Sequence, residues 1–300
     1  MAILESATRN VDHARAAAAR RPRAGKAGGH MVAGWVTYTV LTIVVLISIF
    51  PFLWTIVAAS TSNTEINKVP PNLIPGPNLP KNFEAALTNV NMGTALLNST
   101  IVSGTVAIGT VFFATLAGFA FAKLRFRGRN VLLGLTIATT MVPMQIGIVP
   151  LYLLMNKLHL IGRLPAVILP TLVTAFGVFF LRQYLVRALP DELIEAARID
   201  GASLTRIFLS VVVPLARPAM AVLGMLTFMA TWNDLFWPLI VLNSDNPTVQ
   251  VAIDNLNAGY VPDMSVILAG TLLGTLPVLA VFILLGRQIV GGIMQGAIKQ

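Results

Sequence analysis

The sequence predicts an all-α, polytopic membrane protein with six transmembrane helices. Apolar residues make up 56% of the 300 residues and charged residues only 11%, whereas soluble domains average about 45–50% and about 25%. Six stretches with few or no charges recur along the chain, and each is close to the roughly 20 residues that a helix needs to cross a bilayer. Because lipid offers no hydrogen-bond partner to backbone groups, each stretch has to cross as a helix.

The first uncharged run is far longer than the roughly 7–15 apolar residues of a signal-peptide core, which indicates an uncleaved first span with a kink at Pro51. Two prolines, Pro143 and Pro150, interrupt the third run, so we expect its outer end to be bent or re-entrant. The spans are expected near residues 34–59, 94–122, 131–155, 164–181, 218–242 and 264–286.

The placement of lysine and arginine predicts that the N- and C-termini are both cytoplasmic. With the N-terminus inside, 17 of the 21 basic residues fall on cytoplasmic segments, as the positive-inside rule requires. The four outside are Lys68, Lys81, Lys157 and Arg163. Residues 1–32 are expected to be a largely disordered basic tail. Residues 33–300 form one transmembrane domain, in which no internal repeat is recognisable.

A polar segment, residues 187–217, separates the fourth predicted span from the fifth. Pro190 followed by two acids is typical of a helix start, because proline has the helical φ and negative charge suits the N-terminal end of the dipole. We therefore expect a first helix over Asp191–Asp200. Its smooth apolar side is formed by Leu193, Ala196 and Ala197. An amphipathic helix of this kind needs a partner against which to bury that side.

The second half of the polar segment predicts a turn and another helix. Gly201 fits the left-handed position just past a helix end, which residues with a Cβ resist. Ser203 is a candidate cap for a second helix over Leu204–Val212. Pro214 is expected to stop that helix, since it has no N–H and its ring clashes with the preceding turn.

Within the polar segment, Glu195-Ala196-Ala197 is followed three residues later by Gly201 and nine residues after that by Val211-x-Val213-Pro214. This spacing resembles the EAA loop, EAA-x3-G-x9-I-x-L-P, of permease subunits in bacterial ABC importers; both valine substitutions keep the apolar character. The arrangement of spans and the C-terminal run from Gly291 to Lys299 are similar to the MalG-like subunit of the carbohydrate-uptake branch. The resemblance covers roughly residues 35 to 300.

The resemblance implies a type I ABC importer permease fold in the bacterial plasma membrane, and transport of a sugar such as a disaccharide or oligosaccharide. It implies that the polar segment is the coupling helix that docks on an ATP-binding subunit. The interface residues expected there are Glu195, Ala196, Ala197, Arg198, Asp200, Gly201, Ala202, Ser203 and Pro214.

The resemblance also implies the partners of the chain. These are a second, MalF-like permease, two ATP-binding subunits that hold ATP and Mg, and an extracytoplasmic solute-binding protein. The chain itself is expected to bind no cofactor, no metal and no nucleic acid; its net charge of +9 is explained by the positive-inside pattern.

Polar residues near the outer membrane surface are candidates for the solute path: Asn98, Trp232, Asn233 and Asp234. A carboxylate at that depth is costly unless it faces the bundle or a cavity. One interpretation is a packing or capping role; the other is a polar wall, with Trp232 offering an aromatic face to a sugar. Trp232 and Trp237 could instead belong to the aromatic belt at the membrane surface.

Two outer loops are expected, residues 60–93 and 243–263. The prolines of the first favour extended structure, and the length of the second is typical of functional loops. The resemblance implies that the second reaches the solute-binding protein, with Asn255, Asn257 and Tyr260 as candidate contacts.

An alternative function is a stand-alone ion- or proton-coupled secondary transporter with Asp234 as the proton site. The missing repeat, the single acid at membrane depth and the EAA-like spacing favour the importer. A membrane-embedded enzyme lacks a candidate catalytic group. There is no cysteine, no G-x-x-x-x-G-K-[ST] phosphate-binding pattern and no clustering of the three histidines.

Overall fold

The computed structural model describes residues 34–70, 73–258 and 262–297, and these residues form helices joined by loops, without a β-strand. The chain divides into two units, Met1–Pro51 and Phe52–Gln300. The predicted basic tail and Tyr260 lie outside the described residues. The first predicted span corresponds to α2 (Trp35–Ser60), which carries Pro51 inside it and no charged residue.

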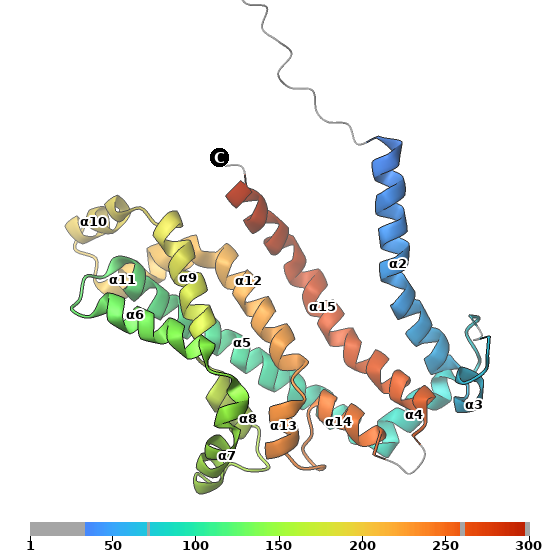
Figure 1. The fold of residues 1–300 in the computed structure, drawn as a ribbon. Helices are drawn as coiled ribbons and strands as arrows, with labels where there is room; N and C mark the ends of the chain where they lie inside the picture. The colour runs from blue at the N-terminus through green and yellow to red at the C-terminus, as the bar shows by residue number, and fades with distance from the viewer. Residues whose placement is uncertain (1–33, 71–72, 259–261, 298–300) are drawn as a thin grey trace, which may run out of the picture. The chain divides into compact units, whose positions relative to one another are not determined.

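The helices of the second unit are shown in Figure 1. They are α3 (Asn63–Ile66), α4 (Leu79–Asn89), α5 (Met92–Lys123), α6 (Arg129–Ala138), η1 (Thr139–Met141), η2 (Met144–Gly147), α7 (Ile148–Lys157), α8 (Pro165–Thr171), α9 (Ala175–Ala188), α10 (Asp191–Ile199), α11 (Leu204–Ile207), the π-helix η3 (Phe208–Val212), α12 (Val213–Trp232), α13 (Phe236–Val241), α14 (Val249–Leu256) and α15 (Met264–Ala297).

The structure has four candidate spans, or up to the predicted six when each bent helix pair is taken as one crossing. In the described residues, four helices are individually long and apolar enough to span a membrane: α2, α5, the stretch Leu204–Trp232, and Met264–Leu284 of α15. The third and fourth spans are each made of two helices. Residues 129–141 and 145–157 meet at 87°, and residues 165–171 and 175–188 meet at 43°. The predicted bend at Pro143 is therefore present.

Two expectations based on proline were wrong. The outer segment 60–93 is not extended throughout, because Leu79–Asn89 is helical with Pro80 in its first turn, where a missing N–H costs little. Pro214 does not end a helix either. It is the second residue of α12, after the π-helical turn Phe208–Val212 has already interrupted the regular i→i−4 hydrogen bonds.

The fifth span consequently occupies a different stretch from the predicted 218–242. The helix runs from Leu204 to Trp232, and α13 follows as a separate short helix after a break at residues 233–235. The span thus begins inside the polar segment, so that the segment and the span share one continuous helix.

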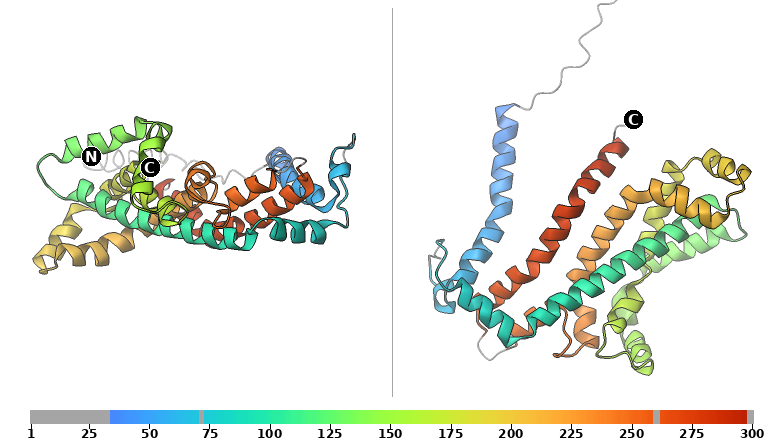
Figure 2. Two further views of the ribbon diagram at one scale, coloured as in Figure 1. Left: turned by 90° about the horizontal axis from the view of Figure 1, so that it is seen from below. Right: turned by 180° about the vertical axis from the view of Figure 1, so that it is seen from behind.

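The core of the second unit is built around α5, which packs against α9 and α12, as the two views of Figure 2 show. The backbones of α5 and α9 approach so closely at Gly118 that a Cβ there would lie 2.9 Å from the backbone nitrogen of Arg182. Small residues allow this kind of approach between membrane helices, where close packing is a main source of association.

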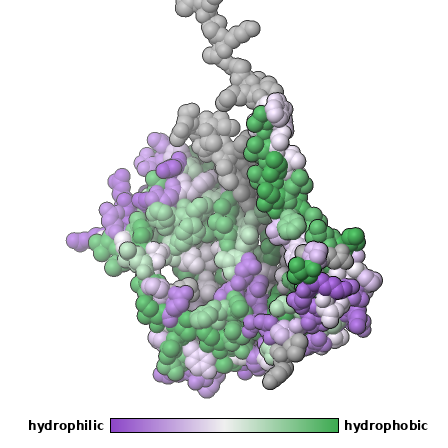
Figure 3. All heavy atoms as spheres, turned by 45° about the vertical axis from the view of Figure 1, so that its right-hand side comes forward, coloured by the Kyte–Doolittle hydropathy of each residue, from purple (hydrophilic) through white to green (hydrophobic). Residues whose placement is uncertain are grey.

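Short helices of the second unit lie at two opposite ends (Figure 1). Helices α10 and α11 are at one end, and α7, α13 and α14 are at the other. In the face drawn in Figure 3, apolar residues cover broad areas and hydrophilic residues gather towards the ends. This distribution fits helices that cross a membrane.

Candidate functional site

The first helix of the polar segment forms as predicted. α10 spans Asp191–Ile199 and follows Pro190, which has an extended conformation, and its first turn carries two acids. Leu189 is fully buried on one side of Pro190, and Ile194 is 5% exposed on the other. These two side chains fix α10 against the core.

The apolar side of α10 is not the one predicted. Ile194, rather than Leu193 and Ala196, faces the hydrophobic core that α5, α9 and α12 share. Leu193 is 47% exposed and Ile199 is 86% exposed. The sequence did not reveal this, because a nine-residue helix offers several apolar stripes and only its anchoring determines which one is buried.

The turn after α10 has the predicted geometry. Gly201 has φ +73°, in the left-handed region, and the N–H of Ala202 donates to the carbonyl of Ala197 at 2.9 Å. Ser203 caps α11, since its hydroxyl oxygen accepts from the N–H of Arg206 at 3.3 Å. Both features are local backbone rules, which is why the sequence predicts them.

Most of the predicted interface residues of the polar segment are available to a partner. The exposed ones are Glu195, Ala196, Arg198, Asp200, Gly201, Ser203 and Pro214. Ala197 and Ala202 pack partly against the core. Leu193 and Ile199 of α10 are exposed as well. The solvent-accessible surface of α10 therefore combines charged side chains with large apolar ones.

The polar segment is joined firmly to the membrane helices. Ile207, Phe208 and Val212, which follow the turn, are buried in the same core as Leu181 and Leu185 of α9. The helix then continues to Trp232, so the second half of the polar segment and the fifth span form one helical stretch packed in this core.

An ion pair that the sequence did not predict ties α10 to α5. The ammonium group of Lys123, the last residue of α5, lies 2.6 Å from a carboxylate oxygen of Asp191. The Lys123 side chain is 8% exposed and that of Asp191 is 71% exposed. The hydrogen bond from Lys123, with the charges of Lys123 and Arg125, lowers the pKa of Asp191 below its ordinary value. From the sequence alone, Lys123 serves only as one of the basic residues that predict which side of the membrane each segment faces.

We predict a pH-dependent contribution of this pair to stability. A lowered pKa in the folded protein means that the ionised Asp191 stabilises the fold at pH values above the ordinary aspartate pKa, and that this is lost as the pH falls through the lowered value. The melting temperature of Asp191→Asn should therefore lie below that of the wild type at neutral pH, and the difference should vanish in acid. A difference that persists unchanged at low pH would contradict the assignment.

Trp232 is an internal packing residue in this conformation. It is 2% exposed, its indole N–H donates to the carbonyl of Gly274 on α15 at 3.1 Å, and its ring stacks on Phe228 with centroids 5.5 Å apart. Trp237 is similarly buried and donates to the carbonyl of Ala166. Neither tryptophan belongs to a membrane-surface belt.

Asp234 and Asn233 lie in the break between α12 and α13. A carboxylate oxygen of Asp234 accepts from the N–H of Phe236 at 3.1 Å, which is a local capping contact. The side-chain amide of Asn233 donates to the carbonyl of Met229 and is exposed. The structure thus contains the capping interaction, and solute contact by these two residues stays a prediction.

Asn98 holds the segment between α13 and α14 in place. It is 5% exposed, and its amide donates to the side-chain oxygen of Asn246 at 2.8 Å and to the carbonyl of Pro247 at 2.9 Å. The neighbouring Ser99 hydroxyl accepts from the N–H of Val249. In this conformation Asn98 serves packing, and the sequence could not show this because its partners lie about 150 residues away.

The predicted outer loop 243–263 contains a helix, α14, that packs against α5 and α15. Its buried side carries Val249, Val251 and Ala252. Asn255 is half-buried and Asn257 is exposed at the end of the helix. Both stay candidate contacts of a solute-binding protein. Among the described residues, no group of three or more histidine, aspartate or glutamate side chains could hold a metal ion.

The fold and the polar segment together define a polytopic α-helical membrane protein with a helix-turn-helix anchored at one end of its spans. Residues 111–291 match the family described as binding-protein-dependent transport system inner membrane component, and the chain belongs to this family. It is a multi-pass protein of the bacterial plasma membrane, in a family of transport components rather than enzymes.

Curated relatives cover nearly the whole chain. The lactose transport system permease protein LacG of Rhizobium radiobacter is 34% identical over 88% of this chain and 96% of its own length. The arabinooligosaccharides transport system permease protein AraQ of Halalkalibacterium halodurans is 32% identical, with 89% and 97% covered. The sn-glycerol-3-phosphate transport system permease protein UgpE of Yersinia enterocolitica is 32% identical, with 86% and 94% covered.

A solved structure shares the fold. It is a bacterial ABC transporter involved in the import of the acidic polysaccharide alginate, with a TM-score of 0.70 and 20% identity over 84% of this chain and 94% of that one. The predicted type I importer permease fold is thereby confirmed. The cytoplasmic position of the two termini stays a prediction.

Proposed function

We propose that this chain is one of two permease subunits of an ATP-driven sugar importer, and that its polar segment docks on an ATP-binding subunit. The observation that carries the proposal is the combination of an exposed, mixed apolar and charged surface on α10 with a buried connection into the fifth span. A surface that has no protein partner would not need large exposed apolar residues such as Ile199.

Movement would pass from the ATP-binding subunit to the span through the turn at Gly201. Because Ile194 and Ile207 bury into the same core on either side of that turn, α10 and α11 change position together with α12. Closure of the ATP-binding dimer would then favour one of two arrangements of the spans, which is alternating access by differential binding.

We propose a neutral di- or oligosaccharide as the solute. The relatives named above transport lactose, arabinooligosaccharides and glycerol phosphate. The Lys123 side chain, 8% exposed, is paired with Asp191, and one guanidinium nitrogen of Arg182 is buried. In the described part of the chain, the polar residues that are buried as whole residues are serines, threonines and asparagines. Such groups bind sugar hydroxyls, whereas a phosphate would favour arginine or lysine.

Purification of the tagged chain from its native membranes tests the proposal. A second permease and an ATP-binding subunit should accompany it, and ATP hydrolysis by the reconstituted complex should rise when the cognate solute-binding protein is added with a sugar. Uptake by the chain alone, driven by an ion gradient and without ATP, would contradict it.

We predict that Asp234→Asn retains most of the uptake. The asparagine side-chain oxygen can accept from the N–H of Phe236 as the carboxylate does, and an importer driven by ATP needs no proton carrier at this position. Uptake into vesicles, measured over a range of pH, should be reduced at most modestly. Loss of uptake at every pH with sugar binding intact would instead indicate a proton site.

A further inference from the structure

The loop that joins α5 to α6 carries a dense group of arginines. Arg125, Arg127 and Arg129 fall within five residues, directly after the last residue of α5, Lys123. Both helices belong to membrane spans, so the loop lies at the boundary where hydrocarbon gives way to headgroups.

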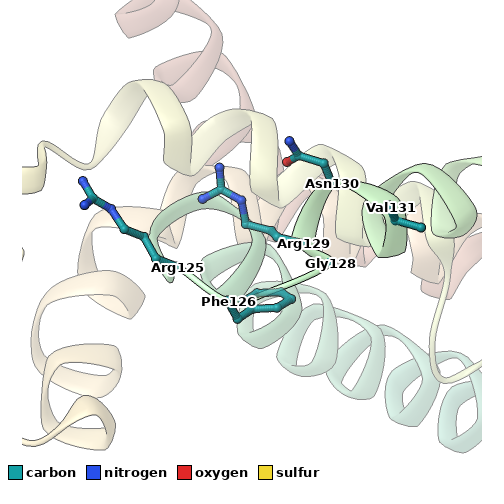
Figure 4. Close-up of a pocket in the computed structure, with 6 residues that line it drawn as sticks. All are labelled: Arg125, Phe126, Gly128, Arg129, Asn130 and Val131. Atoms are coloured by element: carbon teal, nitrogen blue, oxygen red, sulfur yellow. The ribbon is translucent and has the colours of Figure 1, made fainter.

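This loop and the start of α6 line an open pocket of about 510 Å³, the arginine pocket. It is lined by Arg125, Phe126, Gly128, Arg129, Asn130 and Val131. Figure 4 shows the side chains of Arg125, Arg129 and Asn130 projecting to the same side of the loop. No acidic residue lines the pocket, so its two guanidinium groups give it a positive charge.

Arg129 is held in place within the pocket. The residue is half-buried, and one terminal nitrogen of its guanidinium donates to the carbonyl of Leu124 at 3.2 Å. A guanidinium has five N–H donors, so this bond holds one nitrogen while others remain for a ligand. A planar guanidinium matches the oxygens of a phosphate better than an ammonium does.

The surroundings of the arginine pocket are apolar and exposed. Phe126 is 41% exposed and packs on Phe121, with ring centroids 5.9 Å apart. Val131 is 67% exposed and Leu132 is 50% exposed. α6 has no buried residue in this unit. A ligand held here would have its polar part at the arginines and an apolar surface beside it.

We propose that the arginine pocket binds the headgroup phosphate of an anionic phospholipid. Arginine binds phosphate oxygens through paired, charge-assisted hydrogen bonds, and basic pockets at span ends are suited to anionic headgroups. Lipid is favoured over a free anion because the pocket adjoins exposed apolar residues of a membrane span that acyl chains can cover. It is favoured over an acidic protein partner because the pocket adjoins α6, a mostly apolar helix that has no buried residue.

The test counts phosphatidylglycerol molecules bound to the full-length protein, purified with its accompanying subunits in a neutral detergent, by native mass spectrometry. The titration uses dioleoylphosphatidylglycerol, with dioleoylphosphatidylcholine as the neutral lipid. Arg125→Gln combined with Arg129→Gln should weaken the tightest phosphatidylglycerol site about 25-fold, since each basic residue near an anionic surface contributes about fivefold. Arg125→Gln alone, which leaves the bond from Arg129 to Leu124 intact, should weaken it about fivefold.

The control removes the same charge elsewhere. Lys157→Gln combined with Arg163→Gln changes two exposed residues, one at the end of α7 and one in the loop before α8, and should leave the tightest site unchanged. An equal loss in this control would overturn the proposal, and so would unchanged binding in the pocket variants. Displacement of the lipid by millimolar inorganic phosphate would overturn it in favour of a free anion. Release of the ATP-binding subunit by the pocket variants with lipid binding unaffected would overturn it in favour of a protein contact.

Discussion

Gly201→Val is expected to abolish most sugar-stimulated ATP hydrolysis and uptake while the protein still inserts in the membrane. The residue has φ +73°, a conformation that costs a side chain with a Cβ about 1–2 kcal/mol. Apart from Gly201 and its two chain neighbours, no atom lies within 4 Å of the position that a Cβ would occupy, so the effect comes from the local backbone alone. The turn relaxes by changing φ, and α10 is then aimed differently relative to α11.

The matched variant is Gly201→Asn, because asparagine tolerates the left-handed region better than other residues. It should keep most of the stimulated hydrolysis, whereas valine should lose it and release the ATP-binding subunit more readily during purification. ATP hydrolysis, uptake and subunit content should be measured side by side in one detergent. If Gly201→Val keeps its ATP-binding subunit and wild-type stimulated turnover, the polar segment is not the coupling element.

Features of the polar segment that depend on neighbouring residues could be predicted from the sequence. The start of α10 at Pro190, the left-handed Gly201 and the Ser203 cap each follow from backbone geometry within a few residues. The apolar runs likewise correspond to candidate spans, because length and lack of charge suffice to identify them. The third and fourth are bent helix pairs, and the fifth is displaced to Leu204–Trp232. The break at Pro143 could also be predicted, because a proline disrupts a helix through its own ring and its missing N–H.

Features that depend on distant contacts could not be predicted. The bond from Trp232 to Gly274 joins residues 42 positions apart, and the ion pair of Lys123 with Asp191 joins residues 68 apart. Pro214 was misjudged because a π-helical turn ahead of it, stabilised by the burial of Phe208 and Val212, lets the helix continue. Asn98 and Trp232 were proposed for the solute path because they are polar or aromatic, but tertiary contacts bury both in this conformation.

Trp232→Ala is expected to destabilise the protein most among single changes at the end of the second unit that carries α13 and α14. The side chain belongs to a core cluster that includes Met92 of α5 and Val249 of α14, and its N–H bonds to Gly274 of α15. It therefore connects four helices. Removing a buried tryptophan leaves a cavity and costs about 3–5 kcal/mol, and here it also leaves the Gly274 carbonyl without this donor.

Two further variants separate these contributions. Trp232→Phe keeps a ring that can stack on Phe228 and loses the indole hydrogen bond, so it should cost about 1 kcal/mol from the bond plus a smaller packing loss. Phe236→Ala removes an aromatic ring that is 56% exposed and should change the melting temperature in detergent little. The expected order of melting temperatures is wild type close to Phe236→Ala, then Trp232→Phe, then Trp232→Ala. If the melting temperature of Trp232→Ala equals that of Phe236→Ala, the tryptophan is not packed in the conformation present in detergent. A position of Trp232 on an open solute path then becomes the better interpretation.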